Sequence, residues 1–127
     1  MHSKKLEDIS NSNLTRISSY LSELYSSDVA RFRLSDMVKG ADITRVEAFS
    51  VIEYLIEEDT LKPLVEVRCP ICDQREGIYK KKSDIPSRDR SEFCGHSFNT
   101  RDQSNWEVVY SFEGGLNSDF FRNSVIV

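Results

Sequence analysis

Cys69-Pro70-Ile71-Cys72, followed after 21 intervening residues by Cys94-Gly95-His96, contains all three cysteines of this 127-residue chain. Zinc binds about four nitrogen or sulfur ligands in a tetrahedron, and a two-residue gap lets one tight turn present two thiolates to the same ion. His96 is the natural fourth ligand, although the one-residue gap between it and Cys94 is shorter than the common spacings. The spacing therefore predicts one structural zinc ion, held by Cys69, Cys72, Cys94 and His96.

The second half of this predicted site is less regular than the first. A second knuckle of the usual C-x-x-C-G form would have a cysteine at position 91, where this chain has Ser91. The identity of the fourth ligand therefore stays open at this point. The reserve candidates are Asp73, Asp89, Glu92 and His2.

Other roles for the cysteines fit the sequence less well. Thiol–disulfide oxidoreductases place a C-P-x-C motif at the start of a helix, but only four residues separate Cys72 from Gly77 here. Zinc deaminases need His-x-Glu and Pro-Cys-x-x-Cys, and this chain has neither. Free thiols are the remaining alternative, which the C-x-x-C spacing disfavours. Because the sequence shows no nucleophile–base pair, phosphate loop or suitably spaced carboxylate pair, we expect no enzymatic activity.

Length and composition limit the class of protein. A chain of 127 residues with 39% hydrophobic content can build one modest core or two small cores that support each other. It has no apolar run near the ~18 residues of a membrane span, and residues 1–8 lack the apolar core of a signal peptide. We therefore expect a cytoplasmic protein whose cysteines are reduced and free to bind metal.

Hydrophobic periodicity predicts two helices early in the chain. The first covers about residues 14–25, where apolar residues recur at helical spacing and Asn13 is available as N-cap. A short second helix is predicted over residues 35–39, with Ser35 available as N-cap and Gly40 as the C-terminal stop.

The third helix has the clearest start signal. Thr44-Arg45-Val46-Glu47 forms a capping box, in which the threonine and glutamate side chains each satisfy a free backbone N–H of the first turn. The helix should extend to about Glu58 with an apolar stripe on one face. That stripe consists of Val46, Phe49, Ile52, Leu55 and Ile56.

Strands are expected over residues 64–68, 77–80 and 106–112. The order helix, short helix, longer helix and strand is that of a winged helix-turn-helix, with the cysteine turn growing from the first wing strand. The predicted fold class is α+β, an N-terminal winged helix-turn-helix continuing into a C-terminal zinc-ribbon β-hairpin subdomain. The expected divisions are a flexible N-terminus (1–12), the helical part (13–63), strands and ribbon (64–113) and an apolar tail (114–127).

The layout resembles winged-helix proteins that carry a zinc ribbon, such as the alpha subunit of transcription factor E in archaea. The resemblance covers about residues 13 to 112. Its specific part is the motif from Val67 to Cys72 together with the motif from Phe93 to Phe98, while the helical part rests on the order of elements. Ser91 departs from the pattern, because a cysteine would complete the usual second knuckle.

Acidic and basic residues are unevenly distributed along the chain. Residues 1–60 carry 7 basic and 11 acidic residues, and the third helix offers only Arg45 as a base. Phosphate repulsion opposes insertion of such a helix into a DNA groove. Basic residues gather instead around the predicted zinc hairpin, where they would either bind nucleic acid or solvate a loop. They are Arg75, Lys80, Lys81, Lys82, Arg88 and Arg90.

Aromatic and apolar residues suggest two further roles. Phe93, Phe98, Tyr79 and Trp106 could stack on bases, but we favour their closing a small core over the zinc site. After Gly114-Gly115, the tail is apolar and could engage a partner or return to its own core. The candidate partner-binding residues of the tail are Phe120, Phe121, Val125, Ile126 and Val127.

Two hypotheses for the function follow. The first is a non-catalytic, zinc-stabilised adaptor or accessory subunit that binds a protein partner. The second is a DNA- or RNA-binding transcriptional regulator that contacts phosphate through the basic loop. The acidic third helix and the net charge of −4 favour the first.

Overall fold

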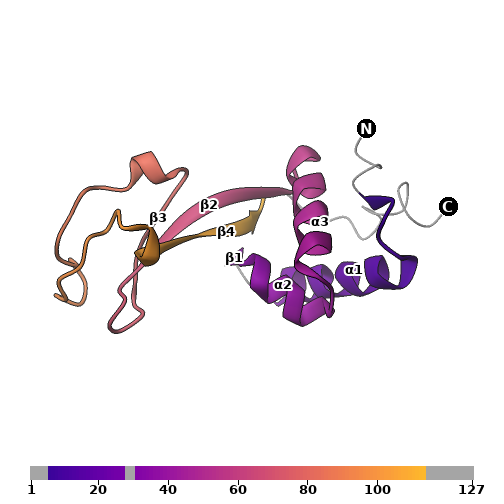
Figure 1. Cartoon of the computed structure of the whole chain (residues 1–127), viewed down its shortest axis with the longest axis horizontal. Helices are drawn as coiled ribbons and strands as arrows, with labels where there is room; N and C mark the ends of the chain where they lie inside the picture. The colour runs from indigo at the N-terminus through magenta and orange to yellow at the C-terminus, as the bar shows by residue number, and fades with distance from the viewer. Residues whose placement is uncertain (1–5, 28–30, 114–127) are drawn as a thin grey trace. The chain divides into compact units, whose positions relative to one another are not determined.

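The computed structural model describes residues 6–27 and 31–113, and these residues form an α+β fold, which confirms the predicted class (Figure 1). Within them lie three α-helices and a four-stranded antiparallel sheet with strand order β1-β4-β2-β3. The helices are α1 (Asn11–Ser26), α2 (Leu34–Ala41) and α3 (Arg45–Glu57). The strands are β1 (Arg31–Phe32), β2 (Leu61–Arg68), β3 (Arg75–Tyr79) and β4 (Trp106–Phe112).

The chain forms two compact units. The helical unit contains the chain up to Lys62 and resumes at Tyr110, and the loop unit consists of Pro63–Val109. The sequence predicts one division over residues 64–113. The structure instead groups the end of β4 with the helices, because Tyr110 and Phe112 pack against their core.

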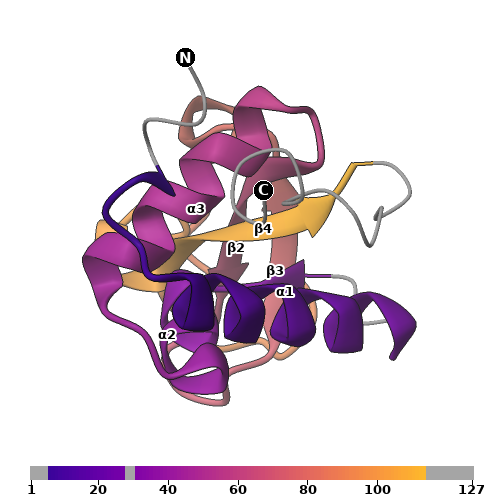
Figure 2. The same ribbon diagram turned by 90° about the vertical axis from the view of Figure 1, so that its right-hand side faces the viewer.

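The helical unit has one continuous apolar core. In it α2 packs against both α1 and α3, as Figure 2 shows. Apolar residues at helical spacing supply the buried side of each helix. The largest fully buried side chains of these helices are Ile17, Leu21, Met37, Val51, Ile52 and Leu55.

Several helix ends differ from the predictions. Ser10, not Asn13, caps α1, because its side chain accepts the backbone N–H of Asn13. The side chain of Asn13 instead donates to Glu47 of α3 over 3.0 Å. Helix α2 begins after Arg33, whose N–H donates to the Asp36 carboxylate, so Ser35 is not its cap.

Gly40 does not stop α2 as predicted but lies inside it. The helix ends at Ala41 and is capped by Asp42, whose φ of 56° is left-handed. At position 40 a Cβ atom would overlap the ring of Tyr20. The glycine therefore allows α1 and α2 to approach closely.

The capping box of α3 is confirmed, but the apolar stripe is only partly right. Thr44 Oγ1 accepts the N–H of Glu47 at 3.1 Å, and the Glu47 carboxylate accepts the N–H of Thr44 at 3.0 Å. Val46 and Phe49, the first two residues of the predicted stripe, are 76% and 50% exposed. The buried side of α3 is formed instead by Ala48, Val51, Ile52, Tyr54 and Leu55.

The remaining corrections concern short segments. Leu6 and Ile9, which lie in the segment predicted to be flexible, are buried in the helical core. Strand β1, which the sequence analysis missed, pairs antiparallel with β4 through Arg31↔Ser111 and Phe32↔Tyr110. Strand β2 begins at Leu61 rather than residue 64, and β3 covers Arg75–Tyr79 rather than 77–80.

Within the described residues, no helix is both long enough and apolar enough to cross a membrane. The apolar tail and its candidate residues Phe120, Phe121, Val125, Ile126 and Val127 lie outside the described residues.

Candidate metal centre

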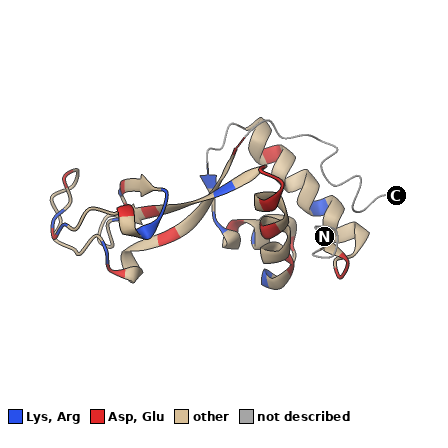
Figure 3. Ribbon diagram, turned by 90° about the horizontal axis from the view of Figure 1, so that it is seen from above, with Lys and Arg blue, Asp and Glu red and all other residues tan. Residues whose placement is uncertain are grey.

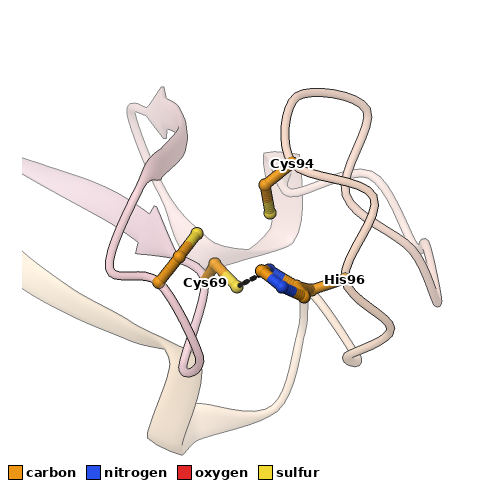
Figure 4. Close-up of side chains that lie close together, drawn as sticks. Cys69, Cys94 and His96 are labelled. Carbon is orange, nitrogen blue, oxygen red and sulfur yellow. Dashed lines mark hydrogen bonds between the residues drawn. The ribbon is translucent and has the colours of Figure 1, made fainter.

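The loop unit brings together the four predicted ligands, Cys69, Cys72, Cys94 and His96. Their ligand atoms all lie within 4.8 Å of one another, and Cys69 Sγ is 3.5 Å from His96 Nδ1. Figure 4 shows the sulfur of Cys94 and the His96 ring directed toward the same space as Cys69. A tetrahedral zinc ion with bonds of about 2.3 Å to sulfur and 2.0 Å to nitrogen holds those two ligand types about 3.5 Å apart. The four residues therefore fit one metal ion.

The first ligand loop directly follows β2. The N–H of Cys69 donates to the carbonyl of Gln74, and the N–H of Asp73 donates to the carbonyl of Cys69, both over 2.9 Å. The N–H of Ile71 approaches Cys69 Sγ at 3.4 Å. Asp73 closes the turn in the left-handed region with φ 62°. These bonds fix the loop so that Cys69 and Cys72 face the same point.

The second ligand loop runs from Ser91 to His96. The N–H of Ser91 donates to the carbonyl of His96 over 2.9 Å. The buried Ser91 hydroxyl accepts the N–H groups of Phe93 and Cys94 at 3.0 and 3.1 Å. Gly95 has φ 76°, a conformation that favours glycine. An isolated bridge between Arg90 and Ser97 closes the base of the loop.

An arginine supports the first loop. Arg68 pairs with the buried Glu66 at 2.9 Å and donates to the carbonyl of Asp73 at 2.8 Å. A charge-assisted hydrogen bond of this length is stronger than a neutral one. Arg68 therefore ties the end of β2 to the turn that carries Cys72.

A second arginine supports the second loop. Glu76 of β3 has a side chain that is 2% exposed, and Arg88 Nη1 lies 3.6 Å from its carboxylate and 3.1 Å from that of Glu92. Glu76 also accepts the backbone N–H of Glu92 over 3.3 Å. This cluster connects β3 to the start of the second ligand loop.

Thr100 and Arg101 hold the long connection between β3 and the second loop. The buried Thr100 hydroxyl donates to the carbonyl of Pro86 at 2.6 Å and accepts the N–H of Arg88 at 3.0 Å. Arg101 donates to the carbonyl of Ile85 at 2.7 Å. The connection is thereby fixed mainly by polar contacts.

The small core beside the ligands is formed by Val65, Val67, Cys69, Ile85 and Phe98. As expected, Tyr79 and Trp106 pack against it, although both are partly exposed. Phe93 departs from the expectation, because its side chain is 62% exposed at the tip of the second loop. Ile71 is 64% exposed at the tip of the first loop.

Local hydrogen bonds favour a thiolate in the second loop. A hydrogen bond with the Ser91 side chain, followed by one with the backbone of His96, lowers the pKa of Cys94 to about 6. The thiolate is the form of cysteine that binds metal. Soft thiolate and imidazole ligands in a group of this size are typical of zinc, whereas magnesium and calcium prefer oxygen.

The reserve ligands do not belong to this group. The carboxylates of Asp73 and Glu92 lie beside Arg68 and Arg88, at 3.8 and 3.1 Å, and Asp89 is exposed. His2 lies outside the described residues. Among the residues that the structure describes, His96 is the one that joins the three cysteines.

The basic residues of the loop unit differ in their surroundings. Arg88 is engaged by Glu76 and Glu92, and only the other five are exposed. They are Arg75, Lys80, Lys81, Lys82 and Arg90. Arg88 therefore serves the structure of the loop unit and is a poor candidate for contacting phosphate.

The supporting roles of Ser91, Glu76 and Thr100 were not predicted from the sequence. The motif Ser91-Glu92-Phe93-Cys94-Gly95 did carry a signal, since it keeps the spacing of a C-x-x-C-G knuckle with one substitution. The pairing of Glu76 with Arg88 had no local signal, because 11 residues separate them in the chain. Comparisons of the chain with protein-family models, curated proteins and solved structures found no match.

Proposed function

We propose that the chain is a zinc-stabilised winged-helix module that is not an enzyme and that docks on a protein partner as an adaptor or accessory subunit. The observation that carries this proposal is the exposed apolar side of α3. Val46 and Phe49, three residues apart on one helix face, are 76% and 50% exposed. Aromatic residues are enriched in the buried centre of protein interfaces, so the exposed Phe49, with Val46 beside it, suits such a contact.

The order of elements supports a winged helix. Two helices, α1 and the shorter α2, precede α3, and the sheet places β4 between β1 and β2. In such a fold the third helix is the one that enters a DNA groove. A surface that reads DNA needs arginine, lysine, asparagine or glutamine at that helix.

Here α3 has the opposite character. Its only basic residue is Arg45, and acidic residues (red in Figure 3) follow along the helix and the turn after it. They are Glu47, Glu53, Glu57, Glu58 and Asp59. Phosphate repulsion would weaken nucleic-acid binding at this helix, whereas an apolar pair bordered by acidic residues suits a partner with an apolar pocket and a basic rim.

The proposed zinc ion is structural. Cys69, Cys72, Cys94 and His96 supply four protein ligands, which is the complete set of a closed tetrahedral site. The ion would join the two ligand loops and stabilise the small core of the loop unit. A catalytic site would instead keep one position for water or substrate.

The second candidate function is nucleic-acid binding through the loop unit. It is favoured by Lys80, Lys81 and Lys82, which are consecutive and exposed. Lysines of this kind bind phosphate without reading sequence, and such binding weakens steeply as salt rises.

One set of variants separates the two functions. Native complexes would be recovered with wild-type chain, with Val46→Ser/Phe49→Ser, and with Val108→Ser as a control for an exposed apolar residue elsewhere. We expect a stoichiometric protein partner that is lost with the α3 variant and retained with the control. Equal recovery with all three chains would overturn the assignment to α3.

Wild type and the variant Lys80→Glu/Lys81→Glu/Lys82→Glu would be titrated with labelled duplex and single-stranded nucleic acid across a salt series. We expect weak binding that is no tighter for wild type than for Lys80→Glu/Lys81→Glu/Lys82→Glu. If wild type binds at near-physiological salt and only the lysine variant loses affinity, the regulator function replaces the adaptor function.

A further inference from the structure

The two ligand loops share one backbone pattern. In the first, the N–H of Cys69 donates to the carbonyl five residues ahead, at Gln74; in the second, the N–H of Ser91 donates to the carbonyl five residues ahead, at His96. Both bonds measure 2.9 Å. Counting from each first residue, position 69 therefore corresponds to position 91.

The correspondence continues through the rest of each loop. The side-chain atom of the first residue accepts the N–H two residues ahead, from Ile71 to Cys69 Sγ at 3.4 Å and from Phe93 to Ser91 Oγ at 3.0 Å. The fifth residue has a left-handed φ in both loops, 62° at Asp73 and 76° at Gly95. The fourth residue is a cysteine in both loops, Cys72 in the first and Cys94 in the second.

Even the exposed tips match. Ile71 and Phe93 occupy the third position of their loops and are 64% and 62% exposed. Both first residues are buried, Cys69 at 1% and Ser91 at 4%. The two loops are thus the same knuckle, with one difference in the residue that begins it.

We propose that Ser91 occupies a vacated ligand position and positions Cys94, while His96 replaces the missing cysteine as fourth ligand. The hydroxyl of Ser91 keeps the acceptor role of the corresponding sulfur, since it accepts the N–H groups of Phe93 and Cys94. His96 belongs to the sixth position, where the first loop has Gln74. Its ring reaches the cluster through Nδ1, 3.5 Å from Cys69 Sγ.

This inference rests on the proposed metal centre but not on the proposed protein partner. It has a direct chemical consequence. A thiol at position 91 would lose its proton to solvent and bind the ion as the corresponding cysteine does, and His96 would become dispensable. The ligand set would change from three sulfurs and one nitrogen to four sulfurs.

The test uses the full chain loaded with Co²⁺ in place of zinc, since the intensity of its thiolate-to-cobalt absorption follows the number of bound sulfurs. Wild type should bind one equivalent with the absorption of three thiolates. A wild-type chain that binds no Co²⁺ and no zinc would contradict the metal centre itself, so that failure is separate from failure of the Ser91 assignment.

Four variants then address position 91. His96→Ala should weaken binding at least 100-fold, and Ser91→Cys/His96→Ala should restore it with the absorption of four thiolates. Ser97→Cys/His96→Ala is the matched control, because it places a thiol beside position 96 but outside the knuckle position. Ser91→Ala should keep the three-thiolate absorption and lower affinity about tenfold, as loss of a supporting hydrogen bond does in other metal sites.

Two results would overturn the proposal. One is a Ser91→Cys/His96→Ala chain that binds Co²⁺ no better than His96→Ala, and the other is equal rescue by the Ser97→Cys control. If the double variants do not fold, the single variant Ser91→Cys decides. Its thiolate absorption should exceed that of wild type by about one third, because the number of bound sulfurs rises from three to four. An unchanged absorption would show that position 91 is not a ligand position.

Discussion

The helical unit and the loop unit differ in what holds them together. Of the described residues, 15 are buried in the core of the helical unit, whereas only 5 form the core of the loop unit. The loop unit compensates with polar supports, among them the buried Glu66 and Glu76 with their arginines. A core of five side chains is too small to fix a long irregular chain by burial alone, which is the situation in which small domains use metal. The difference predicts that metal binding stabilises the loop unit far more than the helical unit.

The unfolding of each unit can be followed separately, because each has its own spectroscopic signal. All three described α-helices belong to the helical unit, so helical circular dichroism reports on it. Trp106 is the only tryptophan of the chain and packs on the core of the loop unit, so its fluorescence reports on that unit.

The largest expected effect is the loss of metal. Chelation, or Cys69→Ser, should unfold the loop unit, because structural zinc contributes on the order of 10 kcal/mol or more to such folds. Trp106 fluorescence should change to that of an exposed indole, while the helical signal stays largely intact. Metal-free protein that keeps its fluorescence, or that loses both signals together, would break the proposed contrast between the units.

A core truncation should produce the converse result. Leu21 is fully buried in the helical core, and Leu21→Ala should lower the stability of the helical unit by about 2–5 kcal/mol. Thermal and denaturant unfolding followed by helical circular dichroism would measure the loss. Metal affinity of the folded variant should equal that of wild type, and a weakened affinity would mean that the two units are not energetically separate.

How far the sequence predicts these units depends on how local each signal is. Two signals are local, because each spans only four residues: the cysteine pair Cys69 and Cys72, and the capping box of Thr44 and Glu47. Spacing alone identifies both. Strand β1 has only two residues, and its pairing with β4 joins positions that are 78 or more residues apart. Short strands carry little periodicity, which is why the sequence did not indicate this one.

Helical spacing of apolar residues predicts their burial only where the whole apolar face of the helix packs against the core. The stripe from Val46 to Ile56 has helical spacing, but its first turn is exposed, because α3 packs through Ala48, Val51 and Leu55. Ser91 shows the same limit at the metal centre. Its spacing from Cys94 was visible, yet its function depends on hydrogen bonds that only the folded loop reveals.

An intermediate effect is expected from breaking the buried ion pair of the loop unit. Arg88→Ala leaves the Glu76 carboxylate buried without its cation, which should destabilise the loop unit by about 1–3 kcal/mol. Trp106 fluorescence during denaturation would report the loss, and the helical signal should not change. Adding Glu76→Gln removes the stranded charge and should recover part of the stability. No recovery would mean that Arg88 acts through packing rather than through its pair.

The smallest expected effect is a pH dependence confined to the helical unit. The backbone N–H of Thr44 holds the pKa of Glu47 below its usual value, with further hydrogen bonds from the side chains of Asn13 and Thr44 and the charge of Arg16, while partial burial acts in the opposite direction. Because the folded-state pKa is lower than the unfolded one, the ionised carboxylate stabilises the fold above the unfolded pKa. That contribution is lost as the pH falls through the folded value. A capping interaction of this kind contributes about 1 kcal/mol, so the expected change is small.

The measurement must avoid the acid sensitivity of metal binding. A chain carrying Cys69→Ser, followed by helical circular dichroism, isolates the helical unit from protonation of the ligands. In that background Glu47→Gln should remove part of the stability difference between neutral and acid pH, because glutamine keeps a capping oxygen but has no proton to gain. An unchanged pH profile would show that other carboxylates govern the acid response of the helical unit. Acid would then destabilise the helical unit through carboxylates other than Glu47, and the loop unit through protonation of its metal ligands.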